Sequence, residues 1–195
     1  SPVVYSKLSR IVNDFSEDEL SDIPVGNMEE ALAHLPGIDI KQRGPEGVQA
    51  DLSIRGGSFD QNLVMLNGIN MSDPQTGHFA LNFPIDLFAV KKIEVLKGSG
   101  SRVFGPNAYS GVLNVITKPA DTNHVRLKLK GGENAFYKAT VNSNFSKGPL
   151  NTMLSFSRSA SGGYIKNTDF NINNLYLQSQ YNLKSGLLDF QFGYS

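Results

Sequence analysis

The chain contains no cysteine, which excludes disulfides, thiol catalysis and cysteine-ligated zinc. It also lacks any run of about 18 apolar residues, so the sequence offers no membrane-spanning helix. Charge of neither sign is in excess, with 18 basic and 18 acidic residues. This balance gives no reason to expect a nucleic acid as partner. Neither a repeat of 20–50 residues nor a low-complexity block is visible.

The first half of the chain predicts a small α+β domain. MEEALAHL, residues 28–35, places its apolar residues on one helical face, with Asn27 as the N-cap and Pro36-Gly37 as the stop. Asn67-Gly68 indicates a tight turn between two strands. The strands predicted in this half are residues 38–42, 51–54, 62–66, 93–96 and 111–117.

The second half, after Lys118-Pro119, predicts a series of antiparallel strands with strict alternation. In residues 124–132, for example, Val125, Leu127 and Leu129 alternate with arginine and lysine. Further alternating segments lie within residues 136–145, 152–157, 175–183 and 188–194. The five strands that contain these segments are expected to be roughly nine to eleven residues long, the length that crosses a bilayer when the strand is tilted.

Alternation of this kind fits a transmembrane β-barrel or a soluble β-sandwich. The connectors favour the barrel, since residues 133–135, 147–149 and 184–186 form short links whereas 160–173 form a long one. Five strands cannot close a barrel, and lipid offers no partner for an open sheet edge. The barrel reading therefore predicts that the chain is a fragment of a longer protein.

Several segments, in order, resemble motifs of the plug domain of TonB-dependent outer-membrane receptors. LSIRG, residues 52–56, is similar to the family's IRG signature, and VMLNGI, residues 64–69, to its LIDG hairpin. MEEALAHLPGIDI, residues 28–40, resembles the family's helix that ends in PGV, and residues 85–118 resemble the stretch containing VLRG. The resemblance covers about residues 15–119. It implies a plug domain over residues 1–119 and the first, truncated barrel strands over residues 120–195.

The resemblance implies an importer in the outer membrane that is not an enzyme and needs no cofactor. The expected partners are the energy transducer TonB, outer-membrane lipid and a small ligand such as cobalamin or a ferric siderophore, with a surface lipoprotein as a further candidate. Residues 54–82 resemble most the plugs of cobalamin-type receptors from Bacteroidetes-type bacteria. The short segment that binds TonB is not recognisable in residues 1–20 and is expected upstream. A soluble secreted binding or adhesion module and a signalling-only receptor are the alternatives.

By position in the family motifs, Arg55 and Lys97 are expected to pair with glutamates of the inner barrel wall. Lys97 stands where the family has arginine, Ser99 where it has proline and Asn67 where it has aspartate. Lysine presents a point charge rather than the forked contact of arginine, so the Lys97 contact should be less directional. The alternative for Arg55 is a solvated position at a strand end.

The resemblance also places two loops, residues 58–61 and 70–82, toward the external medium, and these loops are predicted to bind the ligand. An alternative is that the second loop packs on the barrel wall. The candidate residues are Ser58, Phe59, Asp60, Gln61, Asn70, Ser72, Asp73, Gln75, Thr76 and His78.

Other chemistry finds little support in the sequence. Gly98 and Gly100 follow a predicted strand, but Val103 stands where a dinucleotide-binding loop needs its third glycine, and no helix pattern follows. His34, His78 and His124 lack the spacing of metal ligands. Asp169 is a lone carboxylate in the long loop, which is not a calcium site by itself. No nucleophile–base set is present.

Overall fold

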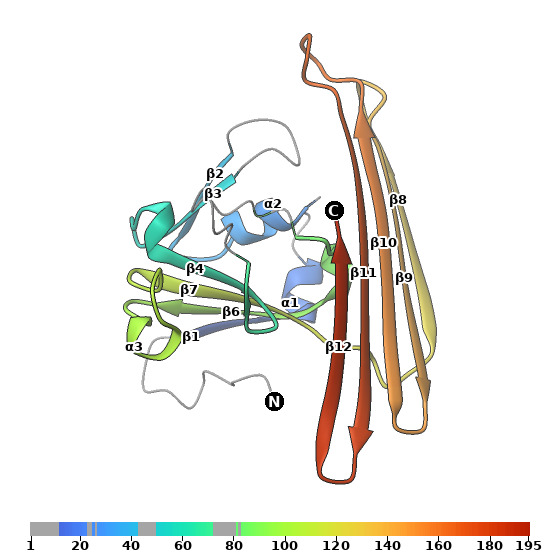
Figure 1. The fold of residues 1–195 in the computed structure, drawn as a ribbon. Coiled ribbons are helices and arrows are strands. Elements are labelled where there is room, and N and C mark those ends of the chain that lie inside the picture. The colour runs from blue at the N-terminus through green and yellow to red at the C-terminus, as the bar shows by residue number, and fades with distance from the viewer. Residues whose placement is uncertain (1–11, 23–24, 26, 43–49, 72–80, 82) are drawn as a thin grey trace. The chain divides into compact units, whose positions relative to one another are not determined.

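The structure is a computed structural model that describes residues 12–22, 25, 27–42, 50–71, 81 and 83–195 (Figure 1). The chain divides into two compact units. Of the described residues, those up to residue 81 and residues 90–117 belong to the first unit. Residues 83–89 and 118–195 belong to the second.

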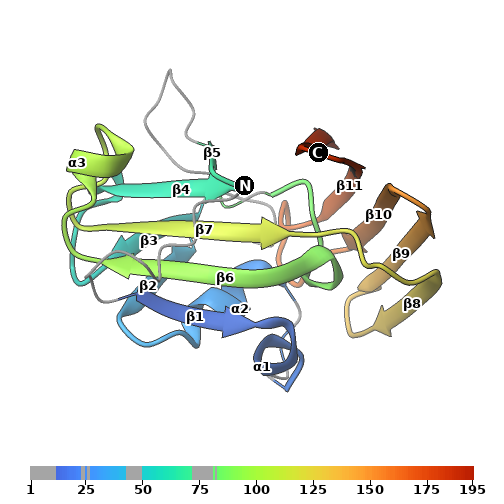
Figure 2. The same ribbon diagram turned by 90° about the horizontal axis from the view of Figure 1, so that it is seen from below.

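A five-stranded sheet is the centre of the first unit, with strand order β1-β6-β7-β4-β5 (Figure 2). Its strands are β1 (Val12–Ser16), β4 (Asn62–Leu66), β5 (Ile69–Asn70), β6 (Val90–Lys97) and β7 (Gly111–Thr117). Only β4 and β7 pair in parallel; the other neighbours are antiparallel. The inner strands β4 and β7 are mostly apolar and buried, and β6 contributes buried apolar residues between charged ones. Ile93, Val95 and Val112 are fully buried. Burial of this surface is the main stabilising contribution to the unit.

A separate two-stranded ribbon joins β2 (Ile38–Gln42) to β3 (Ala50–Ile54). The helix α2 (Met28–Ala33) precedes it and starts as predicted, because the Asn27 side chain accepts a hydrogen bond from the Glu30 N–H at 2.8 Å. The helix ends at Ala33, two residues before the predicted last helical residue, Leu35. Its apolar face, Met28, Ala31 and Leu32, is buried.

One strand and two short α-helices of the first unit were not predicted: β1, α1 (Glu17–Asp22) and α3 (Ser101–Phe104). The expectation that no helix follows Gly100 is wrong. The Gly100 carbonyl accepts hydrogen bonds from the N–H groups of Val103 and Phe104, which closes one helical turn. A four-residue helix is too short to produce a 3.6-residue pattern. The helix does not restore a dinucleotide-binding loop, because Val103, at the position of the third glycine, lies within the helix.

The second unit contains an antiparallel meander of five strands in sequence order (Figure 1). They are β8 (His124–Gly131), β9 (Tyr137–Lys147), β10 (Leu150–Ser161), β11 (Phe170–Leu183) and β12 (Gly186–Tyr194). β10 and β11 are longer than predicted, at 12 and 14 residues. Their pairing continues to Ser161 and Phe170, so the long connector is residues 162–169 rather than 160–173.

The two faces of this meander are exposed in the reverse sense of a soluble sheet. Val125, Leu127 and Leu129 on β8 are 65–70% exposed. On β9, by contrast, Thr140 and Asn142 are at most 1% exposed. The predicted alternation is therefore present, and on the inner strands β9, β10 and β11 the buried face is mainly polar, whereas both faces of the edge strands β8 and β12 are largely exposed.

Candidate functional site

The loop after β3 holds the first group of predicted ligand residues. Arg55 and Gly56 both adopt positive φ, at 53° and 77°, and turn the chain out of the strand. Ser58, Asp60 and Gln61 are exposed, and residues 59–61 form the 3₁₀ turn η2 (Phe59–Gln61). The Ser58 hydroxyl donates to the Asp60 carboxylate. The loop thus presents a carboxylate and an amide to its surroundings.

A buried asparagine holds this loop in place. Asn62 is fully buried at the start of β4. Its amide nitrogen donates to the carbonyls of Leu52 at 3.1 Å and Ser58 at 2.7 Å. At the other side of the loop, the Ser110 hydroxyl donates to the Gln61 side chain at 3.1 Å. Hydrogen bonds from Asn62 and Ser110 therefore fix the loop of residues 58–61, which is called the braced loop here.

The second group of predicted ligand residues is only partly visible. Asn70 is exposed and pairs with Met65, near the end of β4 that lies away from Gln61. The described residues therefore do not bring Asn70 beside Ser58–Gln61. Five of the predicted residues lie outside the described residues: Ser72, Asp73, Gln75, Thr76 and His78.

Arg55 and Lys97 lie close to the same glycine, although they are far apart in the sequence. The Arg55 N–H donates to the Gly37 carbonyl at 3.1 Å. A Cβ placed on Gly37 would lie 3.4 Å from Lys97 Cε and 3.5 Å from its Nζ. Within the described residues, no carboxylate lies within ion-pair distance of either side chain. The glutamate partners of Arg55 and Lys97 are expected on later barrel strands, so this pairing stays a prediction.

The second unit contains a charge contact that the sequence did not suggest. The carboxylate of Asp86 pairs with the Lys138 ammonium at 3.2 Å, and their side chains are only 8% and 12% exposed. Thr140 donates to the same carboxylate at 3.4 Å. Asp86 belongs to residues 83–89, a segment of the second unit that lies in the sequence between two stretches of the first unit and leads into β6. Lys138 and Thr140 lie on the polar face of β9. The plug-like part of the sequence here supplies the acid and the strand supplies the base, opposite in sign to the expected pairs.

Two sequence features mark this contact in hindsight. Asp86 interrupts the apolar stretch FPIDLFAV, and a carboxylate so placed needs a partner if it is buried. Lys138 is the only charged residue on the polar face of β9. Neither feature identifies the other, because nothing in the sequence states which strand the segment meets.

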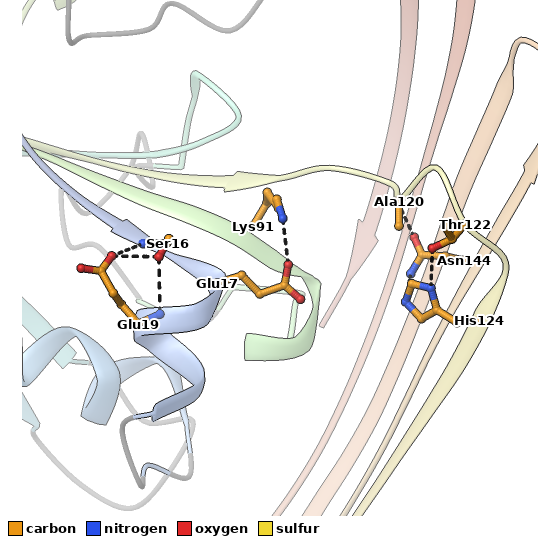
Figure 3. Close-up of polar contacts among 8 residues, drawn as sticks. All are labelled: Ser16, Glu17, Glu19, Lys91, Ala120, Thr122, His124 and Asn144. Atoms are coloured by element: carbon orange, nitrogen blue, oxygen red, sulfur yellow. Dashed lines mark hydrogen bonds and ion pairs between the residues drawn. The ribbon is translucent and has the colours of Figure 1, made fainter.

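The described histidines have ordinary polar partners. His34 contacts the Glu30 carbonyl at 2.8 Å. The His124 ring lies 3.4 Å from the Thr122 hydroxyl and 3.2 Å from the Asn144 amide (Figure 3). Within the described residues there is no group of three side chains suited to hold a metal ion. No helix among them is both long and apolar enough to span a membrane.

Comparison with known proteins identifies the first unit. Residues 6–112 match the TonB-dependent Receptor Plug Domain. The chain belongs to this family. The plug match begins earlier and ends earlier than the range of 15–119 expected from the motifs.

Curated relatives are similar over the same region. The vitamin B12 transporter BtuB of Vibrio cholerae serotype O1 is 34% identical over 107 residues, which is 55% of this chain and 17% of that protein. BtuB of Photobacterium profundum is 29% identical over 124 residues, or 63% of this chain and 20% of that protein. The chain thus spans at most a fifth of the length of these two relatives.

Solved structures resemble both parts of the chain. The pyoverdine outer-membrane receptor FpvA of Pseudomonas aeruginosa PAO1 has a TM-score of 0.77 at 17% identity, covering 93% of this chain and 27% of that one. The ferric citrate transporter FecA has a TM-score of 0.73 at 20% identity, covering 94% and 31%. These matches confirm the predicted fold class, a plug domain followed by antiparallel barrel strands that are partial here. They do not favour the soluble β-sandwich.

Proposed function

We propose that the protein is part of a TonB-dependent outer-membrane transporter that imports a scarce ligand of the cobalamin or iron–siderophore class. Residues 1–119 would be its plug and residues 120–195 its first barrel strands. TonB would drive rearrangement of the plug, and no bond of the ligand would be made or broken. The curated relatives that share the plug carry the name vitamin B12 transporter, which is why cobalamin is the first ligand to test.

The inverted exposure of the inner strands β9, β10 and β11 is the observation that carries this proposal. Leu154 and Phe156 on β10 are 44% and 42% exposed, whereas the intervening Ser155 is 2% exposed. Water penalises an apolar face of this extent, but hydrocarbon does not. A sheet with lipid on one side and polar packing on the other is the arrangement of an outer-membrane barrel wall.

In this proposal the ligand is held in part by the braced loop at Ser58, Asp60 and Gln61. Their exposed hydroxyl, carboxylate and amide suit hydrogen bonding to a polar ligand. Asn70 and the candidate residues between 72 and 78 would complete the site. Arg55 and Lys97 would pair with wall glutamates supplied by later strands. The surface lipoprotein and the Bacteroidetes-type origin stay predictions.

Uptake of radiolabelled cyanocobalamin by cells that lack their own receptor tests the proposal. Cells expressing the intact gene product should accumulate the label, and deletion of tonB should abolish accumulation. Ferric siderophores form the second arm of the assay. Absence of uptake for every probe, together with a protein recovered soluble without detergent, would instead support a secreted binding or adhesion module.

The predicted ligand loop is tested in the same assay. A Ser58→Ala/Asp60→Ala/Gln61→Ala variant should lower uptake at limiting ligand by at least about tenfold, on the order of three lost hydrogen bonds. The matched control is Lys166→Ala/Asn167→Ala/Asp169→Ala in the connector of residues 162–169, which is also exposed. Equal uptake by both variants would remove the Ser58–Gln61 loop from the site.

A further inference from the structure

Residues 83–89, named the strap here, pack with the barrel strands although they lie within the plug sequence. They fall inside the range 6–112 that matches the plug family, yet they belong to the second compact unit. Phe83, Ile85 and Ala89 are each at most 4% exposed. The strap ends in the 3₁₀ turn η3 (Leu87–Ala89), and the chain continues directly into β6.

The strap contacts several strands of the meander, by contacts of different kinds. Asp86 pairs with Lys138 on β9. The Lys128 ammonium of β8 lies 4.9 Å from the centre of the Phe88 ring, a cation–π contact. A Cβ placed on Gly193 of β12 would lie 3.1 Å from Pro84 Cβ, so the two backbones approach closely there. The strap is therefore fixed at points on both sides of the central strands.

The ion pair makes removal of the strap costly. Both side chains are almost fully buried, and separating them would take an opposite charge away from a buried carboxylate and a buried ammonium, which is costly. The Asp86 carboxylate is further held by the Phe88 N–H at 3.2 Å, a bond within the strap that fixes the orientation of the acid. A segment held in this way is suited to stay in place while neighbouring structure moves.

We infer that the strap is a fixed anchor of the plug: it stays seated on the polar face of β8–β12 during transport, and only the rest of the plug rearranges. This inference rests on the proposed function for its transport part. It assigns Asp86 and Lys138 as positioning residues, which act by holding the strap and do not touch the ligand. It also predicts that the ion pair is present in every state of the transport cycle.

A disulfide lock tests the anchor in the intact protein. Pro84→Cys with Gly193→Cys places two thiols on Cβ atoms about 3.1 Å apart, slightly closer than the usual separation of about 3.5–4.5 Å in disulfides. Uptake of cyanocobalamin by the oxidised double variant should stay within twofold of the same cells treated with reductant. A fall of tenfold or more on oxidation that reductant reverses would overturn the inference. Each single-cysteine variant, with and without oxidant, is the control.

A second measurement needs no transport and keeps the two proposals separable. Ala89→Cys in the strap should react with maleimide at least tenfold more slowly than the exposed Lys91→Cys, in energised cells with or without cyanocobalamin. Lys138→Met should speed the reaction at residue 89, and Lys138→Arg should restore protection. Lys147→Met, an exposed lysine on the same strand, should have no effect. Equal rates at residues 89 and 91 would overturn the anchor, whether or not the wild-type protein imports any probe.

Discussion

Gly57 has no room for a side chain. A Cβ at this position would collide with Cβ and Oγ of Ser110, and its backbone does not have positive φ, so the requirement is steric. Gly57→Ala should lower the free energy of unfolding of the intact protein by about 1–3 kcal/mol, measured by denaturant titration. Adding Ser110→Gly should recover most of the loss.

Gly186 provides the control for this test, since a Cβ there meets nothing within 4 Å. Gly186→Ala should change stability by less than about 0.5 kcal/mol. If Gly57→Ala were equally neutral, the close approach that braces the predicted ligand loop would be absent in solution.

Glu19 closes a capping box with Ser16 at the start of α1 (Figure 3). Its Oε2 accepts from the Ser16 N–H at 2.8 Å and from the Ser16 hydroxyl at 2.9 Å. These hydrogen bonds hold the pKa of Glu19 below its usual value of 4.5, and the bond from the Ser16 backbone N–H has the larger effect. A lowered pKa in the folded protein means that the box stabilises fully above pH 4.5 and is lost as pH falls through the folded value.

NMR titration of the Glu19 carboxyl should therefore give a midpoint below 4.5. Ser16→Ala removes the hydroxyl donor but keeps the backbone donor, so the midpoint should move part of the way back. A wild-type midpoint at or above 4.5 would show that the box does not form.

Pairing between β1 and β6 depends on Lys92 as well as on backbone hydrogen bonds. The Lys92 ammonium lies 2.9 Å from both the Asp14 carboxylate on β1 and the Glu94 carboxylate on β6. Burial alone lowers the pKa of Lys92, but the hydrogen bonds to Asp14 and Glu94 outweigh it and the net pKa is raised. The stabilisation is therefore complete below pH 10.5 and is lost only as pH rises through the higher folded value.

Lys92→Met should cost about 3–5 kcal/mol of unfolding free energy, because Glu94 is 1% exposed and would be left as an unpaired buried charge. Asp14→Asn should cost only about 0–1 kcal/mol, since the Asp14 side chain is 42% exposed. Denaturant unfolding of the intact protein measures both. Similar costs for the two variants would contradict this account, and adding Glu94→Gln to Lys92→Met should recover part of the loss.

Elements with strong local patterns were predictable from the sequence. The strands at residues 38–42, 62–66 and 111–117 have the predicted bounds. Each is a run of residues with high β-propensity that has Gly, Pro or Asn close to its ends. β1 was missed because VNDFS carries little apolar signal, and it is a strand only through pairing with β6, far along the chain. The outer end of β10, residues 158–161, is mostly polar, so periodicity there did not reveal that the pairing continues. The outer end of β11 does alternate, with Phe170 and Ile172 alternating with asparagines, but this short signal lies within the predicted connector.

The candidate site shows the same division. Positions such as Arg55 and Ser58–Gln61 could be named because they lie inside local motifs that resemble the plug family. The pair of Asp86 and Lys138 could not be named, since it joins a connecting segment to a strand that begins much later in the chain. Register and docking between distant segments are tertiary properties that local patterns do not encode.

At the scale of the whole molecule, the two units differ in which kind of side chain they bury. The first buries apolar strands such as β4 and β7, as a soluble domain does. The second buries polar residues, among them Asn142 and Gln178, and exposes an apolar face. Both burial patterns are favourable in one protein if the second unit belongs to a barrel wall in lipid and carries the strap on its polar face.

Lipid contact at successive residues of β10 tests this claim most directly. Single cysteines at Leu154, Ser155, Phe156 and Ser157 would carry an environment-sensitive fluorophore, with the intact protein in vesicles containing nitroxide-labelled lipid. The account predicts strong quenching at residues 154 and 156 and little at residues 155 and 157, which are 2% and 5% exposed. Equal quenching at all four positions, or quenching at none, would contradict it.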